Sequence, residues 1–121
     1  MIALVVDDSA AMRRIQQKAL ESSGWQVEVA NNGSEALIRL DGLGHCDLLL
    51  TDWHMPEMDG IELVRAVRKD ERWKGLRVVM VTSDGVLDSV EQALAAGADD
   101  FVMKPFSADA LCERIAEVMH A

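Results

Sequence analysis

Four apolar runs in this sequence each deliver a side chain that can do chemistry. The run IALVV is followed by Asp7 and Asp8, LLLT is followed by Asp52, RVVMVT ends on Thr82, and DFVMK ends on Lys104. Uninterrupted apolar runs of this length are typical of strands buried on both faces of a parallel sheet. Because ligands bind beyond the carboxyl ends of parallel strands, we expect these side chains to meet at one edge of the sheet.

Three carboxylates at one edge would repel one another unless positive charge compensates them. Two unit charges about 4 Å apart repel by about 4 kcal/mol at an effective dielectric constant of about 20. A hard cation with oxygen ligands relieves that repulsion, and several carboxylates with open water positions suit Mg²⁺. Asp7, Asp8 and Asp52 are therefore the predicted metal ligands, and Lys104 adds a second positive charge.

The same residues predict the reaction. Phosphoryl transfer depends mainly on positioning and on neutralising the charge of the phosphoryl oxygens. A cation, the Lys104 ammonium and the Thr82 hydroxyl around Asp52 would provide both. Aspartate carboxylates act as nucleophiles that form aspartyl-phosphates, so Asp52 is the predicted phosphoryl acceptor.

Alternating strands and helices must position these side chains. The strands are expected at Ile2–Val6, Trp25–Ala30, Cys46–Thr51, Arg77–Thr82 and Asp100–Lys104. The helices are expected from Met12 to Leu20, from the segment NNGSEALIRL, from Gly60 to Lys69, from Val86 to Ala96, and after Ser107. Five strand–helix units predict an α/β fold with a parallel sheet covered on both faces.

Helical spacing predicts which side chains face the sheet. In the first helix the inward set is Met12, Ile15, Ala19 and Leu20, and the outward set is Arg13, Arg14, Gln16 and Gln17. In the later helices the inward sets are Ile61, Leu63, Val64 and Val67, then Leu87, Val90 and Leu94, and finally Leu111, Ile115 and Val118.

The composition bounds the class of protein. The 121 residues fit one domain, residues 1–121, and the net charge of −9 disfavours direct binding to nucleic acid or insertion into an anionic membrane. The start of the chain lacks the pattern of a signal peptide, and no apolar run is long enough to span a bilayer, so we expect a cytoplasmic protein. Cys46 and Cys112 have no metal-type spacing and are expected to be reduced, partly buried thiols.

Four motifs, in order and across the whole chain, resemble the receiver domain of two-component response regulators. These are VVDDS, LLLTDWHMPEMDG, VMVTSDG and FVMKPF. Each motif is weak alone, but the set on five βα units is specific. The resemblance implies a CheY-like, flavodoxin-like (βα)5 doubly wound fold with a five-stranded parallel sheet in the order 2-1-3-4-5.

The resemblance also implies a role for individual residues. Asp52 is similar to the phosphorylated aspartate, and Asp7 and Asp8 to the acidic pair that holds Mg²⁺ with the backbone carbonyl of His54. Thr82 resembles the switch hydroxyl and Lys104 the phosphate-binding lysine. The Lys104–Pro105 peptide would be cis, as in the family.

Three positions depart from the chemotaxis-type pattern or vary within the family. The aromatic switch position holds Phe101, where tyrosine is frequent, so this side chain has no hydroxyl to offer a partner. His54 and Asp84 occupy variable positions that tune phosphate lifetime in the family. We expect the His54 side chain to be exposed and Trp53 to be a partly exposed aromatic beside the site.

The resemblance therefore implies a stand-alone phosphorylation switch that is not a turnover enzyme, although it would dephosphorylate itself. Its donor would be a histidine kinase or a histidine phosphotransfer protein, and its signal would pass to a downstream target protein. The protein would be monomeric, with dimerisation on phosphorylation left open. The surfaces expected to make these contacts carry Ser89, Gln92 and Ala95 on the fourth helix and Ala108, Asp109 and Cys112 on the fifth.

Three other functions remain open at this point. A phosphatase-like hydrolase of the haloacid-dehalogenase type would need an acid two residues after Asp52, where this chain has His54. A flavodoxin-like cofactor binder would need a phosphate-welcoming first loop, where this chain has Asp7 and Asp8. A receiver fold could also act as an unphosphorylated docking module, which the intact set of acids, hydroxyl and lysine disfavours.

Overall fold

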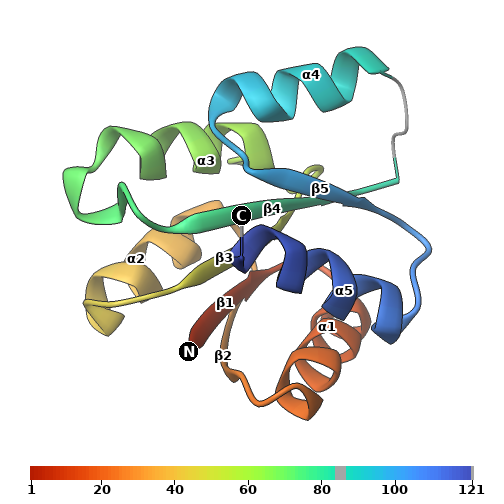
Figure 1. Cartoon of the computed structure of the whole chain (residues 1–121). Coiled ribbons are helices and arrows are strands. Elements are labelled where there is room, and N and C mark those ends of the chain that lie inside the picture. Colours follow the sequence, from red (N-terminus) through yellow and green to blue (C-terminus); the bar gives the residue numbers. More distant parts are fainter. Residues whose placement is uncertain (84–86, 121) are drawn as a thin grey trace.

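The computed structural model describes residues 1–83 and 87–120, and the side chain of Leu87 lies outside this description. Five parallel strands form one sheet in the order β2-β1-β3-β4-β5 (Figure 1), which confirms the expected topology. The strands are β1 (Ile2–Val6), β2 (Gln26–Ala30), β3 (Leu48–Asp52), β4 (Arg77–Thr82) and β5 (Asp100–Met103). All five lie within two residues of the bounds expected from the sequence.

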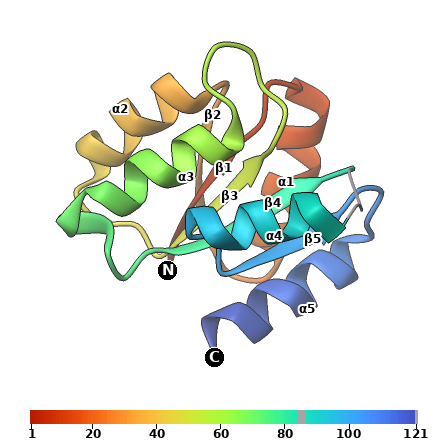
Figure 2. The ribbon, with the colours of Figure 1, turned by 90° about the horizontal axis from the view of Figure 1, so that it is seen from above.

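Helices cover both faces of the sheet. They are α1 (Ala10–Ser22), α2 (Gly33–Leu43), α3 (Gly60–Lys69), α4 (Leu87–Ala96) and α5 (Ala108–Met119), with a short 3₁₀ turn at Glu71–Trp73. The helices α2, α3 and α4 lie side by side on one face, and α1 and α5 cover the other (Figure 2). This two-sided arrangement is the doubly wound fold that the alternating elements predict.

The alternation of side chains along each strand builds two separate cores. On β1, Leu4 and Val6 pack under α2 and α3, whereas Ala3 and Val5 pack under α1 and α5. Since both faces of a buried parallel strand must be apolar, the strand sequence has no polar position until the strand ends. The first polar residues therefore stand at the carboxyl edge.

Side-chain caps fix where each helix begins after its loop. Ser9, Asn32 and Ser107 accept hydrogen bonds from backbone N–H groups in the first turns of α1, α2 and α5. At α3, Asp59 and Glu62 form a reciprocal capping box. These caps satisfy N–H groups that a helix start leaves without partners, and all four lie in loops on the carboxyl side of the sheet.

The inward faces of α3 and α5 are confirmed, because their predicted inward residues are all buried. In α1 the predictions for Ile15 and Gln16 are wrong: Ile15 is 50% exposed and Gln16 is completely buried. The reason is a polar partner, since Gln16 Nε2 donates a hydrogen bond to the buried carboxylate of Asp7. Hydrophobic periodicity does not register such a contact.

Helix α4 differs from the prediction in a similar way. Leu94 is 45% exposed and the inward place is taken by Ala93, which is buried in the core cluster. A small side chain at the contact lets a helix lie close to the sheet, and the larger neighbour is then left outside. The predicted positions Asp84 and Val86, and the side chain of Leu87, lie outside the described residues.

Candidate functional site

The loop after β1 supplies two acids with different exposure. The carboxylate of Asp7 is completely buried, whereas Asp8 is exposed. Asp7 Oδ1 accepts a hydrogen bond of 2.9 Å from the backbone N–H of Ser9, which leads into α1. The buried acid is thus fixed by the start of the helix, and the exposed acid faces the solvent side of the site.

The strand β3 brings Asp52 beside these acids. Asp52 is its last residue, and its Oδ1 accepts a hydrogen bond of 2.9 Å from the N–H of Trp53. Ligand atoms of Asp7, Asp8 and Asp52 all lie within 4.8 Å of one another. The three acids that the sequence placed at the ends of two strands therefore meet in one cluster.

Lys104 provides the positive charge of this cluster. Its Nζ lies 3.3 Å from Asp52 Oδ1 and 3.3 Å from Asp7 Oδ2. The backbone N–H of Lys104 donates to the carbonyl of Thr82 at 2.8 Å, which ties the end of β5 to the end of β4. The Lys104–Pro105 peptide that follows is cis, as the resemblance implied.

The electrostatics of Asp52 follow from this arrangement. Burial raises the pKa of Asp52 above its ordinary value, the negative charge of Asp7 raises it further, and Lys104 lowers it. Each of these effects acts on the charged form of the carboxylate. Burial and a neighbouring negative charge destabilise that form, and a cation stabilises it. A further cation at the cluster would bring the pKa of Asp52 down.

The donor set fits a hard divalent cation. Three carboxylates converge, one of them is exposed to solvent, and the cluster has a single lysine among the described residues. Mg²⁺ is bound in proteins through a few carboxylates while it keeps several waters, and these residues match that requirement. The chemistry of the site therefore agrees with the predicted ligands Asp7, Asp8 and Asp52.

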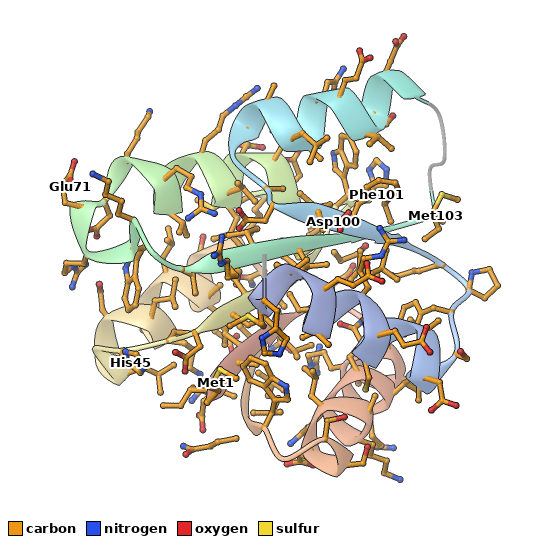
Figure 3. The ribbon with its side chains drawn as sticks, in the orientation of Figure 1. Met1, His45, Glu71, Asp100, Phe101 and Met103 are labelled. Carbon is orange, nitrogen blue, oxygen red and sulfur yellow. The ribbon has the colours of Figure 1, made fainter. Side chains whose placement is uncertain are left out.

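Thr82 and Phe101 stand on the two neighbouring strands. Thr82 ends β4 and is 1% exposed, and Phe101 on β5 is half-buried against the core under α4. Figure 3 shows Phe101 on β5, with Met103 further along the strand. The guanidinium of Arg114 on α5 lies 5.8 Å from the Phe101 ring centroid, so this ring contacts α5 as well.

The loop between β3 and α3 forms one wall of the site. His54 is exposed, as expected, but the prediction for Trp53 is wrong because its side chain is only 7% exposed. Trp53 packs in the core with Met55 and Ile61, since the loop folds back over it and Gly60 donates to its carbonyl at 2.7 Å. The rings of Trp53 and His54 stack with centroids 5.8 Å apart.

Two residues of α1 that were predicted to face the solvent belong to the site instead. Arg13 Nη1 donates to the backbone carbonyl of Asp7 at 2.7 Å, and Gln16 Nε2 donates to Asp7 Oδ2 at 3.3 Å. Their spacing of three residues puts both on one side of the helix. A signal was available, because this polar pair lies on the first helix after the acidic pair, but apolar periodicity outweighed it.

The predicted outer surfaces are mostly exposed. Gln92 and Ala95 on α4 and Ala108 and Asp109 on α5 are exposed, and Ser89 is half-buried. Cys112 is an exception, because it is half-buried and its Sγ donates to the carbonyl of Ala19 on α1 at 3.4 Å. It therefore belongs to the contact between α1 and α5 and not to an outer face.

A family model for the response regulator receiver domain matches residues 3–116, which is nearly the whole chain. The chain belongs to the response regulator receiver family. It is 42% identical over 120 residues to the chemotaxis protein CheY1 of Helicobacter pylori, covering 98% of this chain and 97% of that protein. It is 44% identical over 119 residues to the chemotaxis protein CheY of Pseudomonas aeruginosa, covering 98% of this chain and 95% of that one.

The fold of this receiver also matches a solved structure. The chemotaxis response regulator CheY4 of Vibrio cholerae superposes with a TM-score of 0.92 at 32% identity, covering 97% of both chains. Within residues 1–83 and 87–120, no helix has the length and apolar character needed to cross a membrane. The chain is thus a CheY-like receiver of two-component signalling, and the two relatives named above are chemotaxis proteins.

Proposed function

We propose that this receiver accepts a phosphoryl group on Asp52 from the phosphohistidine of a kinase or of a histidine phosphotransfer protein. The observation that carries the proposal is the shared ammonium of Lys104, 3.3 Å from both Asp52 and the buried Asp7. A lysine that contacts two carboxylates can move its ammonium group toward a phosphoryl group once that group is attached to one of them. Asp8, after β1, and Thr82, at the end of β4, are also suited to this reaction.

In the proposed transfer, a carboxylate oxygen of Asp52 attacks the phosphorus atom. The new O–P bond forms as the P–N bond of the phosphohistidine breaks, and the electron pair returns to the imidazole nitrogen, which takes a proton from solvent. Lys104 then shifts from the carboxylates toward the phosphoryl oxygens. When Mg²⁺ is bound by Asp7, Asp8, Asp52 and the carbonyl of His54, it supplies neutralisation of the transferred charge.

The proposed output is a shift between two conformations of the surface formed by α4, β5 and α5. The hydroxyl of Thr82 turns toward the phosphoryl group, and Phe101 follows into the space beside it. Support comes from the burial of Thr82 and from the intermediate burial of Phe101, whose ring contacts Arg114 on α5. New charge at Asp52 would bias this equilibrium, and a partner protein would bind one conformation better.

We further propose that hydrolysis of the aspartyl-phosphate ends the signal. Water attacks the phosphorus atom, the O–P bond to Asp52 breaks, and inorganic phosphate leaves. His54 is exposed beside the site, and we expect its side chain to influence access of that water. The protein therefore resets itself without being a turnover enzyme.

Tryptophan fluorescence tests the proposal. Mg²⁺ is titrated into the purified protein, acetyl phosphate is then added, and Asp52→Asn serves as the control. The chain has three tryptophans, so Trp53→Phe identifies the part of the signal that comes from the residue next to Asp52. We expect a saturable Mg²⁺ response and a further response to acetyl phosphate that Asp52→Asn lacks.

The outcome separates the phosphorylation switch from the unphosphorylated docking module. A folded protein that responds to neither Mg²⁺ nor acetyl phosphate would contradict the phosphorylation switch and favour a docking module. A response to Mg²⁺ alone leads to intact-mass analysis, because fluorescence reports the surroundings of Trp53 and not the bond at Asp52. Absence of any added phosphoryl mass would then contradict the proposal.

A further inference from the structure

Gln16 is a buried polar residue in an otherwise apolar face of α1. Its side chain is completely buried, together with its helix neighbours Ala19 and Leu20. Its Nε2 donates to Asp7 Oδ2 at 3.3 Å, and its Oε1 has no hydrogen-bond partner among the described residues. A buried carboxamide with an unpartnered oxygen costs free energy, so its presence calls for a reason beyond packing.

The orientation of the carboxamide follows from Asp7. If the amide were turned over, Oε1 would face the carboxylate oxygen, and two acceptors would meet without a proton between them. With Nε2 toward Asp7, the partnerless oxygen lies away from the acid. The unpartnered Oε1 is thus unfavourable, whereas the hydrogen bond from Nε2 to the carboxylate is favourable.

The surroundings of Asp7 show what Gln16 adds. The N–H of Ser9 holds Oδ1 at 2.9 Å, whereas Oδ2 receives both Gln16 and Lys104 at 3.3 Å. Lys104 is at the same distance from Asp52, so its charge is divided between two acids. Without Gln16, Lys104 alone among the described residues would donate a hydrogen bond to Oδ2.

We propose that Gln16 is a positioning residue of this receiver site. Together with the N–H of Ser9 it fixes the carboxylate of Asp7 at both oxygens, in the orientation needed for Mg²⁺. Its N–H group also stabilises part of the negative charge of Asp7. Lys104 is then free to shift toward Asp52 when the phosphoryl group arrives. This inference rests on the proposed function, since it assigns Gln16 a role toward the same metal and the same transfer.

The substitution Gln16→Met tests the inference, because methionine has a similar length and no donor. Gln17→Met is the matched control, since the neighbouring Gln17 donates to the exposed Glu21 on the same helix and not to Asp7. Magnesium chloride is added stepwise while tryptophan fluorescence is recorded, and thermal unfolding is measured separately in EDTA. Outer hydrogen-bond partners of metal ligands are typically worth a factor of ~10–100 in affinity, so we expect Gln16→Met to raise the Kd for Mg²⁺ about tenfold.

The control and the unfolding data separate positioning from stability. We expect Gln17→Met to keep the original Kd, and Gln16→Met to unfold in EDTA within a few degrees of the unaltered protein. An unchanged Mg²⁺ affinity in folded Gln16→Met would overturn the inference while leaving the proposed function intact. If the unaltered protein itself fails to bind Mg²⁺, the proposed function falls and this inference falls with it.

A measurement on the unaltered protein keeps the test valid if Gln16→Met does not fold. The side-chain amide signals of Gln16 are followed by ¹H–¹⁵N NMR while Mg²⁺ is added, with Gln17 as the internal reference. We expect the Gln16 signals to shift along the same binding curve as the fluorescence, and those of Gln17 to stay in place. Stationary Gln16 signals at saturating Mg²⁺ would contradict the inference.

Discussion

The ammonium of Lys104 lies 3.3 Å from Asp52 Oδ1, across the carboxyl edge of the sheet. Asp52 ends β3 and Lys104 directly follows β5, on the far side of β4, and the contact exists because parallel strands bring their carboxyl ends to one side. The same ammonium contacts Asp7, whose side chain is almost fully buried. A single cation thus stabilises two acids before any phosphoryl group is present.

Removal of this cation is expected to destabilise the protein most when Mg²⁺ is absent. Breaking a buried ion pair costs ~3–5 kcal/mol, and Lys104 is partly exposed, so Lys104→Met should lower the free energy of unfolding by about 2 kcal/mol in EDTA. Added Mg²⁺ should recover part of this loss, and the rate of phosphorylation by acetyl phosphate should fall. Urea denaturation with and without Mg²⁺ measures the difference. The exposed Lys69→Met is the control, and an equal effect of both substitutions would contradict the assignment.

The acceptor carboxylate is expected to lower stability at neutral pH. Burial, and then the charge of Asp7, raise the pKa of Asp52 above its ordinary value of 3.8. The folded state therefore holds this proton more tightly than the unfolded state does, so stability falls as the pH rises from that value through the raised pKa. Asn carries no such charge. The free energy of unfolding of Asp52→Asn in EDTA should exceed that of the unaltered protein near neutral pH.

The pH dependence provides the check on this prediction. The advantage of Asp52→Asn should shrink as the pH falls through the raised pKa toward 3.8, because folded Asp52 becomes protonated and the unfolded carboxyl then begins to take up its own proton. Urea denaturation at about pH 7 and about pH 4 would show it. Asp109→Asn, at an exposed position of α5, serves as the reference. An advantage of equal size at both pH values would show that charge is not its cause.

The start of α3 is expected to be intolerant of a side chain. A Cβ on Gly60 would meet the carbonyl oxygen of Asp52 and would lie 2.9 Å from Trp53 Cα, and backbone at this distance cannot move aside easily. We expect Gly60→Ala to lose about 2 kcal/mol of stability and to weaken Mg²⁺ binding, because it displaces the acceptor strand end. Gly42→Ala in α2 meets nothing within 4 Å and should gain about 0.5 kcal/mol. Thermal unfolding of both variants decides the point, and similar effects would contradict it.

The two thiols are expected to differ in reactivity. Cys46 is buried, its Sγ donates to the carbonyl of Leu48 at 3.2 Å, and burial raises the pKa of its thiol to about 11. Cys112 is only half-buried. A disulfide reagent near neutral pH should therefore modify Cys112 in the folded protein and Cys46 only after unfolding. Modification of Cys46 as fast as Cys112 would contradict the burial argument.

The raised pKa of Cys46 also predicts a loss of stability in alkali. The folded state keeps this proton above the ordinary pKa of 9.0, at which the unfolded thiol begins to lose its own. Stability should be insensitive to this group below that pH and should fall as the pH rises from there toward 11. Cys46→Ala should remove this part of the pH dependence in urea denaturation. An identical alkaline decline in both proteins would assign it to other groups.

Much of the fold and of the site could be predicted from the sequence, because both depend on the ends of buried strands. A strand covered on both faces stays apolar until it ends, so Asp7, Asp52 and Lys104 mark three strand ends and one edge of the sheet together. The strand order came from the resemblance and not from periodicity. Helices α3 and α5 were also predictable, because their apolar faces are complete.

The errors arose where a polar or small side chain takes an inward place. Gln16 is buried because Asp7 gives it a partner, and Ala93 is buried because α4 lies close to the sheet. Trp53 was expected to be partly exposed, but the loop that carries Gly60 folds over it. Such contacts join residues that are distant in the sequence or depend on loop geometry, and an apolar period contains neither kind of information.

The most direct test of the proposed switch is to locate the phosphoryl group by mass spectrometry. The protein is incubated with acetyl phosphate and Mg²⁺, and the acyl phosphate is reduced with borohydride, which converts a phosphorylated aspartate to homoserine. Peptide mapping should then find homoserine at Asp52, dependent on Mg²⁺ and absent from Asp52→Asn. Homoserine at another acid, or none at all in folded protein that binds Mg²⁺, would contradict the assignment of Asp52 as the phosphoryl acceptor.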